Sequence, residues 1–242
     1  MGQGHGWEGA VLKLLRGKDF AFTVTEAEDV TPRYRRLRLT DGGMLAATGV
    51  HPTMWVRLWF DDAGRPHQRA YTLVDPDPAA GTFSLEFALH DGRASDWARA
   101  ARPGDTIEAT VHGSAFTEPS PAPSHVFAVA DTASLPALNS LLDSVGTAPA
   151  TIWFETDHGT GGLPLRAAPS RHDVREVPRR DQGAHLVSEI KSTLPDLLKD
   201  QPAPYVWIAC DTTTTRSLTS YVRKELSLPR QRVNAMGYWR AA

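Results

Sequence analysis

The apolar pattern of this chain changes its period at one place, a stretch at residues 118–124 that contains three prolines. Before this stretch, short runs alternate apolar and polar side chains, as half-buried antiparallel strands do. After it, continuous apolar runs of strand length alternate with segments whose apolar residues recur at helical spacing. The change predicts two domains joined by a stiffened linker, the first all-β and the second α/β. We place them at residues 1–120 and 121–242.

Six strand-length runs precede the linker, and turn residues separate them. They span residues 20–24, 36–39, 55–60, 69–74, 83–89 and 106–112. Residues 75–81 are rich in Asp, Pro and Gly and are expected to form a turn. Short strands in this number predict an antiparallel barrel or sandwich, of which we expect a six-stranded β-barrel. A helix is expected at residues 94–101, and one helical turn near Val11 to Leu15.

The second domain is predicted to hold a parallel sheet. Its expected strands are residues 125–130, 151–155, 173–177, 205–209 and 233–238, with helices after Ser134 and over residues 186–198 and 218–226. Ligands of such sheets bind at the carboxyl ends of the strands, which here are the loops at residues 131–134, 155–158 and 210–213. No loop carries the G-x-G-x-x-G fingerprint. Asp and Thr in these loops are explained equally well as ligand contacts and as helix caps.

The totals exclude several classes of protein. A formal net charge of -2 does not favour nucleic acid or an anionic membrane as partner. No apolar run approaches the ~20 residues of a membrane span, and the first residues lack a secretion signal. A single cysteine, Cys210, excludes an internal disulfide and a cysteine-based metal site. We therefore expect a cytoplasmic protein with no membrane span and no metal site.

Arg69, Tyr71 and Thr72 form a chemically distinctive group in the fourth strand. Alternate side chains of a strand share a face, so Arg69 and Tyr71 point one way and Thr72 the other. A guanidinium clamps phosphate, a phenol ring covers a flat heterocycle, and a hydroxyl or backbone N–H bonds the edge of that ring. The group indicates a site for a flat, phosphorylated ligand, although an ordinary exposed strand explains it as well.

The helix expected at residues 94–101 begins with small residues, Ala94 and Ser95, after Gly92. The N–H groups at such a start are available to an anion. A helix that caps the barrel and buries Trp97 is the alternative, and the two roles are compatible.

Five stretches in this order resemble one known family. They are residues 69–72, 90–98, 101–105, 130–137 and 237–240. Together with a barrel followed by an α/β domain, they resemble the ferredoxin–NADP reductase superfamily. Within it, the closer resemblance is to the siderophore-interacting protein family of FAD-dependent ferric-siderophore reductases. The resemblance runs from about residue 20 to the end of the chain.

The resemblance implies FAD in the first domain. Arg69 would hold the pyrophosphate, Tyr71 would cover the isoalloxazine ring, and Thr72 would bond near its reactive nitrogen. Tyr71 and Thr72 are accordingly the catalytic candidates. The donors to the pyrophosphate at the helix start would be Gly92, Ala94 and Ser95. His90 and Trp239 are further flavin neighbours, with a hydrogen-bonded strand-end histidine and a buried strand anchor as their alternatives.

The resemblance also implies a nicotinamide dinucleotide on the second domain, NADPH first and NADH as the other choice. Its contacts would be Thr132, Ser134, Asp211 and Thr212. Arg179 or Arg180, after the strand that ends at Val177, is the candidate for the 2′-phosphate. The chain departs from its relatives at residues 209–211, which read Ala-Cys-Asp instead of Ala-Gly-Glu. There Cys210 would place a side chain where the nicotinamide approaches.

The function expected from these residues is a reductase. It would pass electrons from NAD(P)H through FAD to a ferric siderophore and release Fe(II) for iron uptake. The first alternative is a general NAD(P)H–flavin or ferredoxin-type oxidoreductase, with ferredoxin as a further partner. The second is a non-catalytic protein that binds flavin or a siderophore.

Overall fold

The computed structural model describes residues 17–62 and 64–240, and the chain divides into two compact units, Met1–Phe116 and Thr117–Ala242. We describe each unit by itself. The helical turn predicted near Val11 to Leu15 lies outside the described residues.

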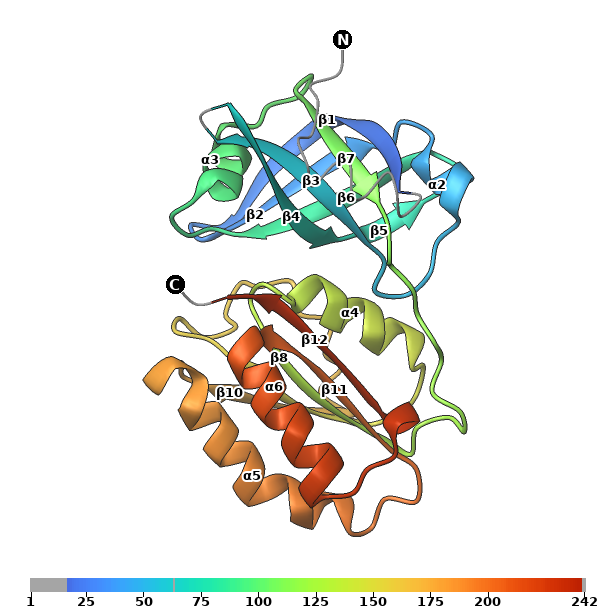
Figure 1. The fold of residues 1–242 in the computed structure, drawn as a ribbon, viewed down its shortest axis with the longest axis vertical. Helices are drawn as coiled ribbons and strands as arrows, with labels where there is room; N and C mark the ends of the chain where they lie inside the picture. The colour runs from blue at the N-terminus through green and yellow to red at the C-terminus, as the bar shows by residue number, and fades with distance from the viewer. Residues whose placement is uncertain (1–16, 63, 241–242) are drawn as a thin grey trace. The chain divides into compact units, whose positions relative to one another are not determined.

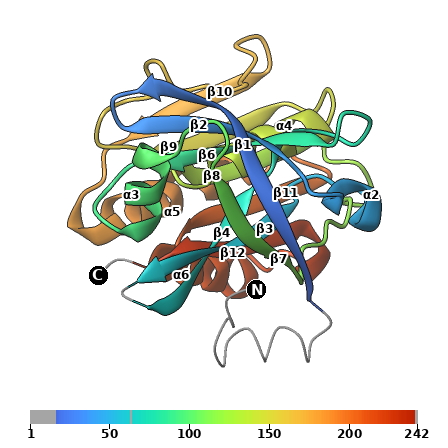
Figure 2. The same cartoon turned by 90° about the horizontal axis from the view of Figure 1, so that it is seen from above.

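The first unit is a curled antiparallel sheet (Figures 1 and 2). Its strand order is β4-β3-β7-β1-β2-β6-β5. The strands are β1 (Lys18–Thr31), β2 (Tyr34–Thr40), β3 (Trp55–Asp62), β4 (Arg65–Thr72), β5 (Val74–Asp77), β6 (Thr82–Ala88) and β7 (Thr106–Val111). Two helices, α2 (Met44–Thr48) and α3 (Arg93–Ala100), lie at opposite ends of the curled sheet. The predicted fold class, an antiparallel barrel-like unit followed by an α/β unit, is confirmed.

The predicted count of six strands is one too low, because β5 is a separate strand. After Thr72 the chain leaves β3 and pairs Val74 and Asp77 with β6. A bulge interrupts this pairing, and Asp75 takes a positive φ of 47°. Pro76 fits because β5 is an edge strand, where a missing N–H breaks no ladder. The Asp and Pro residues of this stretch, which predict a turn, therefore belong in part to a bulged edge strand.

The core of the first unit follows the alternation seen in the sequence. The inward side chains of β1, β2 and β6 are at most 1% exposed, namely Phe22, Val24, Leu37, Leu39, Phe83, Leu85 and Phe87. The rings of Phe22 and Phe83 meet edge to face at 4.9 Å. Burying such side chains is worth roughly 1.5–3 kcal/mol each, so this interior holds the sheet in its curled form.

The second unit is a parallel sheet with strand order β10-β9-β8-β11-β12. Its strands are β8 (His125–Asp131), β9 (Ala150–Glu155), β10 (His172–Val177), β11 (Pro204–Asp211) and β12 (Val233–Trp239). Its helices are α4 (Leu135–Ser144), α5 (Ala184–Leu198) and α6 (Thr212–Ser220), with the shorter turns η1 (Asp181–Gly183), η2 (Tyr221–Glu225) and η3 (Arg230–Arg232). All four neighbouring strand pairs are parallel, and the five predicted strands are present.

Helices α5 and α6 lie side by side (Figure 1) and pack on the sheet through one shared core. That core includes Leu186 and Ile190 of α5 and Leu218 of α6. Pro195 lies inside α5, where a proline ordinarily kinks or ends a helix, yet the helix continues to Leu198. A proline has no N–H to bond the carbonyl four residues earlier, which is that of Lys191. The Tyr221 hydroxyl donates to this carbonyl at 3.2 Å, so the missing bond is replaced from η2.

Within residues 17–62 and 64–240, no helix is long and apolar enough to cross a membrane. The same residues contain no group of three or more His, Cys, Asp or Glu side chains that could hold a metal ion.

Arg232 ties the beginning of the second sheet to the chain that leads into it. It is 7% exposed, and its guanidinium donates to the carbonyls of Pro204 at 2.8 Å, Pro121 at 2.6 Å and Ala203. Replacing it removes a charged donor from three carbonyls at once. We expect Arg232→Met to lower the free energy of unfolding by about 3 kcal/mol, because unpaired buried acceptors keep their desolvation cost. Urea unfolding, with hydrogen exchange of β11 and β12 amides, measures this.

Arg230→Met is the matched control, because Arg230 lies in the same turn but is exposed. It should change stability by less than about 0.5 kcal/mol. Equal losses in the two variants would show that charge near η3, rather than the three carbonyl bonds, stabilises the sheet.

Candidate functional site

Arg69, Tyr71 and Thr72 lie on β4, an edge strand that is hydrogen-bonded to β3 alone. The backbone groups on the other side of an edge strand have no strand to pair with. Arg69 is exposed, and its guanidinium donates to the carbonyl of its neighbour Gln68 at 2.8 Å. A cation with so local a partner can turn toward a phosphate at little cost.

Tyr71 is held by an aromatic cluster that joins β3, β4, β6 and α3. Its ring lies 4.4 Å from Phe87 and 6.4 Å from Phe60, and Trp97 of α3 lies 5.9 Å from each of these two. Burial raises the pKa of the phenol, against the opposing charge of Arg69, so Tyr71 stays neutral at physiological pH. The cluster brings the β4 residues into the neighbourhood of α3.

Thr72 is 5% exposed, and its Oγ1 has no hydrogen-bond partner among the described residues. Almost all buried polar atoms in folded proteins are paired, so an unpaired one needs a reason. A ligand atom at the end of β4 would provide a partner. This hydroxyl is therefore the strongest sign in the first unit that something binds there.

The start of α3 presents backbone donors. Gly92 precedes the helix with a φ of 142°, which favours glycine, and as the N-cap residue it has no side chain to cap the first turn. The first N–H groups of a helix have no intrahelical acceptor, so those of the first turn, including Ala94, are available to an anion. Ser95 is 2% exposed, and its Oγ accepts from the His90 N–H at 3.2 Å, while His90 Nδ1 lies 2.7 Å from the Asp91 carbonyl. Ser95 and His90 thus shape the loop that leads into the helix.

These features fit a flavin dinucleotide. Arg69 and the α3 N–H groups suit two phosphate charges, Tyr71 offers a ring held in place, and Thr72 offers an unpaired hydroxyl. A separate hollow of about 240 Å³ on the same unit contains none of these residues. The charges that line it include the cross-strand pairs Glu26–Arg38 and Glu28–Arg36, which is an ordinary neutralised sheet surface.

In the second unit, the loop after β8 satisfies its own hydrogen bonds. The Asp131 N–H donates to Ser134 Oγ at 2.9 Å, and the Ser134 N–H donates to Asp131 Oδ1 at 3.0 Å. Ser134 is fully buried, whereas Thr132 is half-buried. Ser134 therefore acts within the protein as the turn that starts α4.

The loop after β11 is closed in the same way. Asp211 is 1% exposed, and its Oδ1 accepts from the N–H groups of Thr213 at 2.9 Å and Thr214 at 3.0 Å. The Thr212 hydroxyl donates to the Trp239 carbonyl at 2.8 Å and ties α6 to the end of β12. A Cβ on Gly237 would lie 2.8 Å from that hydroxyl, so glycine is required for the close approach.

Arg179 connects these loops. Its guanidinium binds Glu155 at the end of β9, lies 3.4 Å from Asp211 Oδ2, and stacks over the Trp239 ring at 4.7 Å. The Trp239 indole N–H donates to Asp131 Oδ2 at 2.6 Å. Burial would raise the pKa of Asp211, but bonds from Thr214 and the charge of Arg179 bring it below its ordinary value. Arg179, Trp239 and the three acids form what we call the strand-end network.

The expectation that Cys210 obstructs the nicotinamide is wrong. Its side chain is fully buried in the core shared with α5 and α6, and its sulfur lies 3.4 Å from Thr215 Oγ1. Burial raises the pKa of this thiol well above its usual range. The residue that replaces glycine therefore points into the core.

The strand-end network is not among the predictions from the sequence, which name neither Asp131 nor Glu155 as a site residue of the loops that contain them. The signal was present, since β8, β9 and β11 each end on an acidic residue, namely Asp131, Glu155 and Asp211. Arg179, considered for a 2′-phosphate, has its partners within the protein. Arg180 is exposed.

Two family models match the chain. One, described as "Siderophore-interacting protein", matches residues 123–242, and the other, "Siderophore-interacting FAD-binding domain", matches residues 46–113. Among curated proteins, the mycobactin import ATP-binding/permease protein IrtA of Mycobacterium tuberculosis is 31% identical over 246 residues. That match covers 98% of this chain and 28% of that protein, so the chain spans about a quarter of its length. The ferric acinetobactin reductase of Acinetobacter baumannii is 25% identical over 198 residues, 78% of this chain and 67% of that protein.

Solved structures match residues of both units. The siderophore-interacting protein SipS from Aeromonas hydrophila has a TM-score of 0.76 at 25% identity, over 93% of each chain. A ferredoxin–NADP⁺ reductase from Neisseria gonorrhoeae with bound FAD and NADP has a TM-score of 0.69 at 16% identity, over 92% of this chain and 99% of that one, which shows the fold alone. The two family models follow each other along most of the chain. The chain therefore belongs to the siderophore-interacting protein family, and its fold is also that of ferredoxin–NADP⁺ reductases.

Proposed function

We propose that the chain is a flavin-dependent reductase that takes electrons from a nicotinamide dinucleotide and delivers them to a ferric siderophore. The observation that carries the proposal is the β4 edge of the first unit, where an exposed guanidinium and an unpaired hydroxyl flank a fixed ring. It lies within the residues that match a siderophore-interacting FAD-binding domain. The likeness to a ferric acinetobactin reductase supports the substrate class.

Each residue of this edge has a role in holding the flavin. Arg69 and the N–H groups at the start of α3 would bind the pyrophosphate, so two negative charges meet one cation and several oriented donors. Tyr71 would set the plane of the isoalloxazine ring and exclude water from one face. Thr72 Oγ1 would bond the ring edge near its reactive nitrogen. Flavin, when bound, supplies the conversion between two-electron and one-electron transfer.

Release of the metal needs no acid or base from the protein. Reduction of Fe(III) to Fe(II) gives a softer ion that hard oxygen ligands hold less well, so the chelate loosens. The residues of this chain therefore bind and orient, and the redox step itself accounts for iron release.

A non-catalytic binder of flavin or siderophore is the second candidate. The observation that favours it is the strand-end network, whose donors are already paired within the second unit. The likeness to ferredoxin reductases shows the fold alone and does not extend to ferredoxin as a partner.

Anaerobic titration of the FAD-loaded protein tests the proposal. We expect NADH or NADPH to bleach the flavin absorbance bands, and a ferric hydroxamate or catecholate chelate to restore them with Fe(II) appearing in a chromogenic trap. Faster turnover with free flavin than with any ferric chelate would indicate a general flavin reductase. No bleaching by either dinucleotide would favour the binder.

Arg69→Ala should weaken FAD binding by about 10-fold or more and leave riboflavin binding unchanged, because a charge-assisted phosphate contact is worth roughly 1.5–3 kcal/mol. Titration of flavin fluorescence measures both. Arg65→Ala is the matched control, since Arg65 is an exposed arginine of the same strand. Equal weakening of FAD and riboflavin by Arg69→Ala would refute the pyrophosphate role.

Thr72→Val removes the unpaired hydroxyl and keeps the shape of the side chain. Without flavin, the variant should be as stable as the parent or slightly more so, because no hydrogen bond of the described structure is lost. With FAD, the stopped-flow rate of flavin reduction should fall about 10-fold, which corresponds to one hydrogen bond to the reacting ring. The half-buried Thr82→Val on β6 serves as control. An unchanged rate in Thr72→Val would remove Thr72 from the site.

A further inference from the structure

The second unit has a defined place for a dinucleotide. The strand order of the sheet is β10-β9-β8-β11-β12. The chain adds β9 and β10 on one side of β8 and then returns to add β11 and β12 on the other side, so the topological switch point lies between β8 and β11. Ligands of such sheets bind at the carboxyl ends of the strands beside this switch point. The two strands that flank it end on the buried carboxylates of Asp131 and Asp211.

The helix starts beside the switch point offer few donors to phosphate. At α4 the Ser134 N–H donates to Asp131, and Pro136 has no N–H to give. At α6 the N–H groups of Thr213 and Thr214 both donate to Asp211. A phosphate that came to α6 would have to displace the Asp211 carboxylate, and at α4 Asp131 already takes the Ser134 N–H that precedes the helix.

Arg179 is likewise engaged, since Glu155, Asp211 and the Trp239 ring surround it. Arg180 and Arg240 are exposed, but they follow β10 and β12, the two outermost strands. Exposed single cations contribute little in water.

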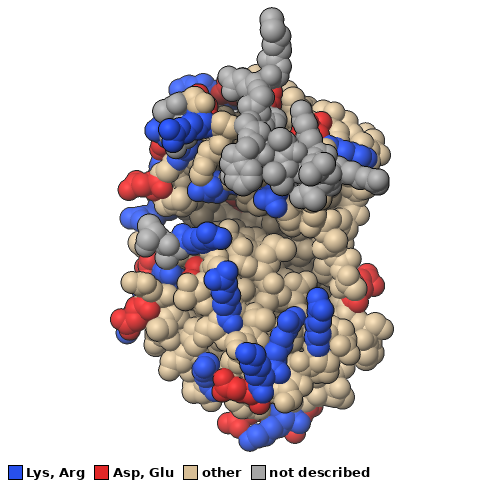
Figure 3. Space-filling model, in the orientation of Figure 1, with Lys and Arg blue, Asp and Glu red and all other residues tan. Residues whose placement is uncertain are grey.

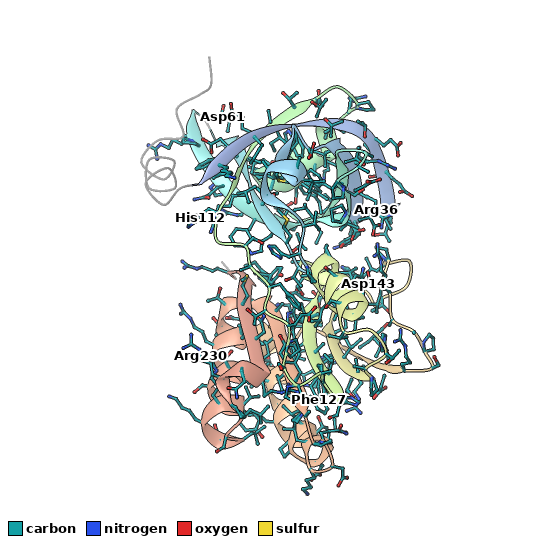
Figure 4. The ribbon with its side chains drawn as sticks, turned by 90° about the vertical axis from the view of Figure 1, so that its right-hand side faces the viewer. Arg36, Asp61, His112, Phe127, Asp143 and Arg230 are labelled. Carbon is teal, nitrogen blue, oxygen red and sulfur yellow. The ribbon has the colours of Figure 1, made fainter. Side chains whose placement is uncertain are left out.

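Other cations of the second unit are gathered elsewhere. Figure 3 shows Lys and Arg side chains over the face of α6 and β12, and among the exposed cations of this unit are Arg223 and Lys224 of η2 and Arg230 of η3. Because α6 starts at the carboxyl ends and the chain must return to begin β12, these residues lie toward the amino ends of the strands. Arg230 is at the outer surface of the unit (Figure 4). They are therefore remote from the switch point.

Glu155 differs from the other two acids in having a free oxygen. Its Oε2 binds Arg179, while its Oε1 has no partner among the described residues, and the residue is 2% exposed. It ends β9, the second strand of the unit, where dinucleotide-binding sheets carry the acid that accepts from a ribose 2′-hydroxyl. A carboxylate oxygen accepts a hydroxyl and repels a phosphate.

We propose that Glu155, with Arg179 held between it and Asp211, makes this chain select NADH over NADPH. The selection has a favourable and an unfavourable part. Glu155 Oε1 matches the free 2′-hydroxyl of NADH, whereas a 2′-phosphate would face that oxygen and find the nearest guanidinium already paired. Oε1 has no exposed surface, so the ribose reaches it by displacing neighbouring side chains while Arg179 keeps its bond to Oε2. The inference rests on the proposed function, in which a nicotinamide dinucleotide is the electron source.

The first measurement needs no variant. Titration calorimetry of the full chain with NADH and with NADPH should give a dissociation constant about 10-fold or more lower for NADH, the value of one charged contact made or lost. As a readout without redox chemistry, 5′-ADP should bind more tightly than 2′,5′-ADP. Equal or tighter binding of the 2′-phosphorylated member of each pair would overturn the proposal.

Glu155→Gln tests whether Glu155 causes the selection, because the substitution keeps the shape of the side chain and removes the charge that holds Arg179. NADPH binding should strengthen about 10-fold, with NADH binding weakened or unchanged. Glu225→Gln, an exposed acid of the same unit, makes the same change of charge and should leave the ratio as it is. If both variants shift the ratio alike, or a folded Glu155→Gln does not shift it, Glu155 is not the selecting residue.

Arg180→Ala should also leave the ratio of NADH to NADPH affinity unchanged. Loss of NADPH binding alone would show that Arg180 binds a 2′-phosphate and would refute the proposal.

The outcome of these binding measurements is separate from the outcome for the proposed function. If both dinucleotides bleach the flavin equally, the reductase stands and the selection falls. If neither bleaches it, the electron source falls, and the calorimetric preference is still decided by binding alone.

Discussion

The contact on which the second unit depends is the one between Arg179 and two carboxylates at the ends of different strands. Glu155 ends β9, Asp211 ends β11, and Arg179 follows β10. Through the Trp239 ring and its bond to Asp131, the same group reaches β12 and β8. Buried carboxylates carry a high desolvation cost, which ion pairs and hydrogen bonds offset. Arg179 pairs the acids that end two strands, and the Trp239 indole and the Ser134 N–H bond the acid that ends the third.

The two units satisfy their polar groups in opposite ways. Among the described residues of the first unit, Arg69 donates to a neighbouring carbonyl, Gly92 gives α3 no side-chain cap, and the Thr72 hydroxyl is unpaired. In the second, Asp131 closes the loop that leads into α4, and Asp211 caps α6. A ligand of the first unit gains new hydrogen bonds, whereas a ligand of the second exchanges them for existing ones. This difference suits a resident group in the first unit and an exchanging one in the second.

The local pattern predicted most of the fold and little of the network. Alternating and continuous apolar runs located the strands, because the period of the apolar pattern reflects which residues are buried. Five or six positions are enough to show that period. The local pattern missed β5, where Pro76 and a bulge hide a pairing with β6 that is specified by the rest of the sheet. Arg179 could be chosen from its place after Val177, but its partners are 24 and 32 positions away. Cys210 was placed on the wrong side because a residue's place in a motif does not tell which way it faces.

A weakly held dinucleotide is no disadvantage to a reductase. Binding that is equally strong in the ground state and the transition state lowers KM without raising kcat, and a donor must leave after each transfer. Where the donors of a site are already paired within the protein, a ligand binds by exchanging its own hydrogen bonds for existing ones. Such a site rejects a ligand group that cannot replace the bonds it breaks. A hydroxyl can take up the free oxygen of Glu155, while a second phosphate brings charge to an edge where acids outnumber the available cation. In the function that we propose, the burial of acids at the strand ends, costly for stability, would thereby act as a filter on the electron source.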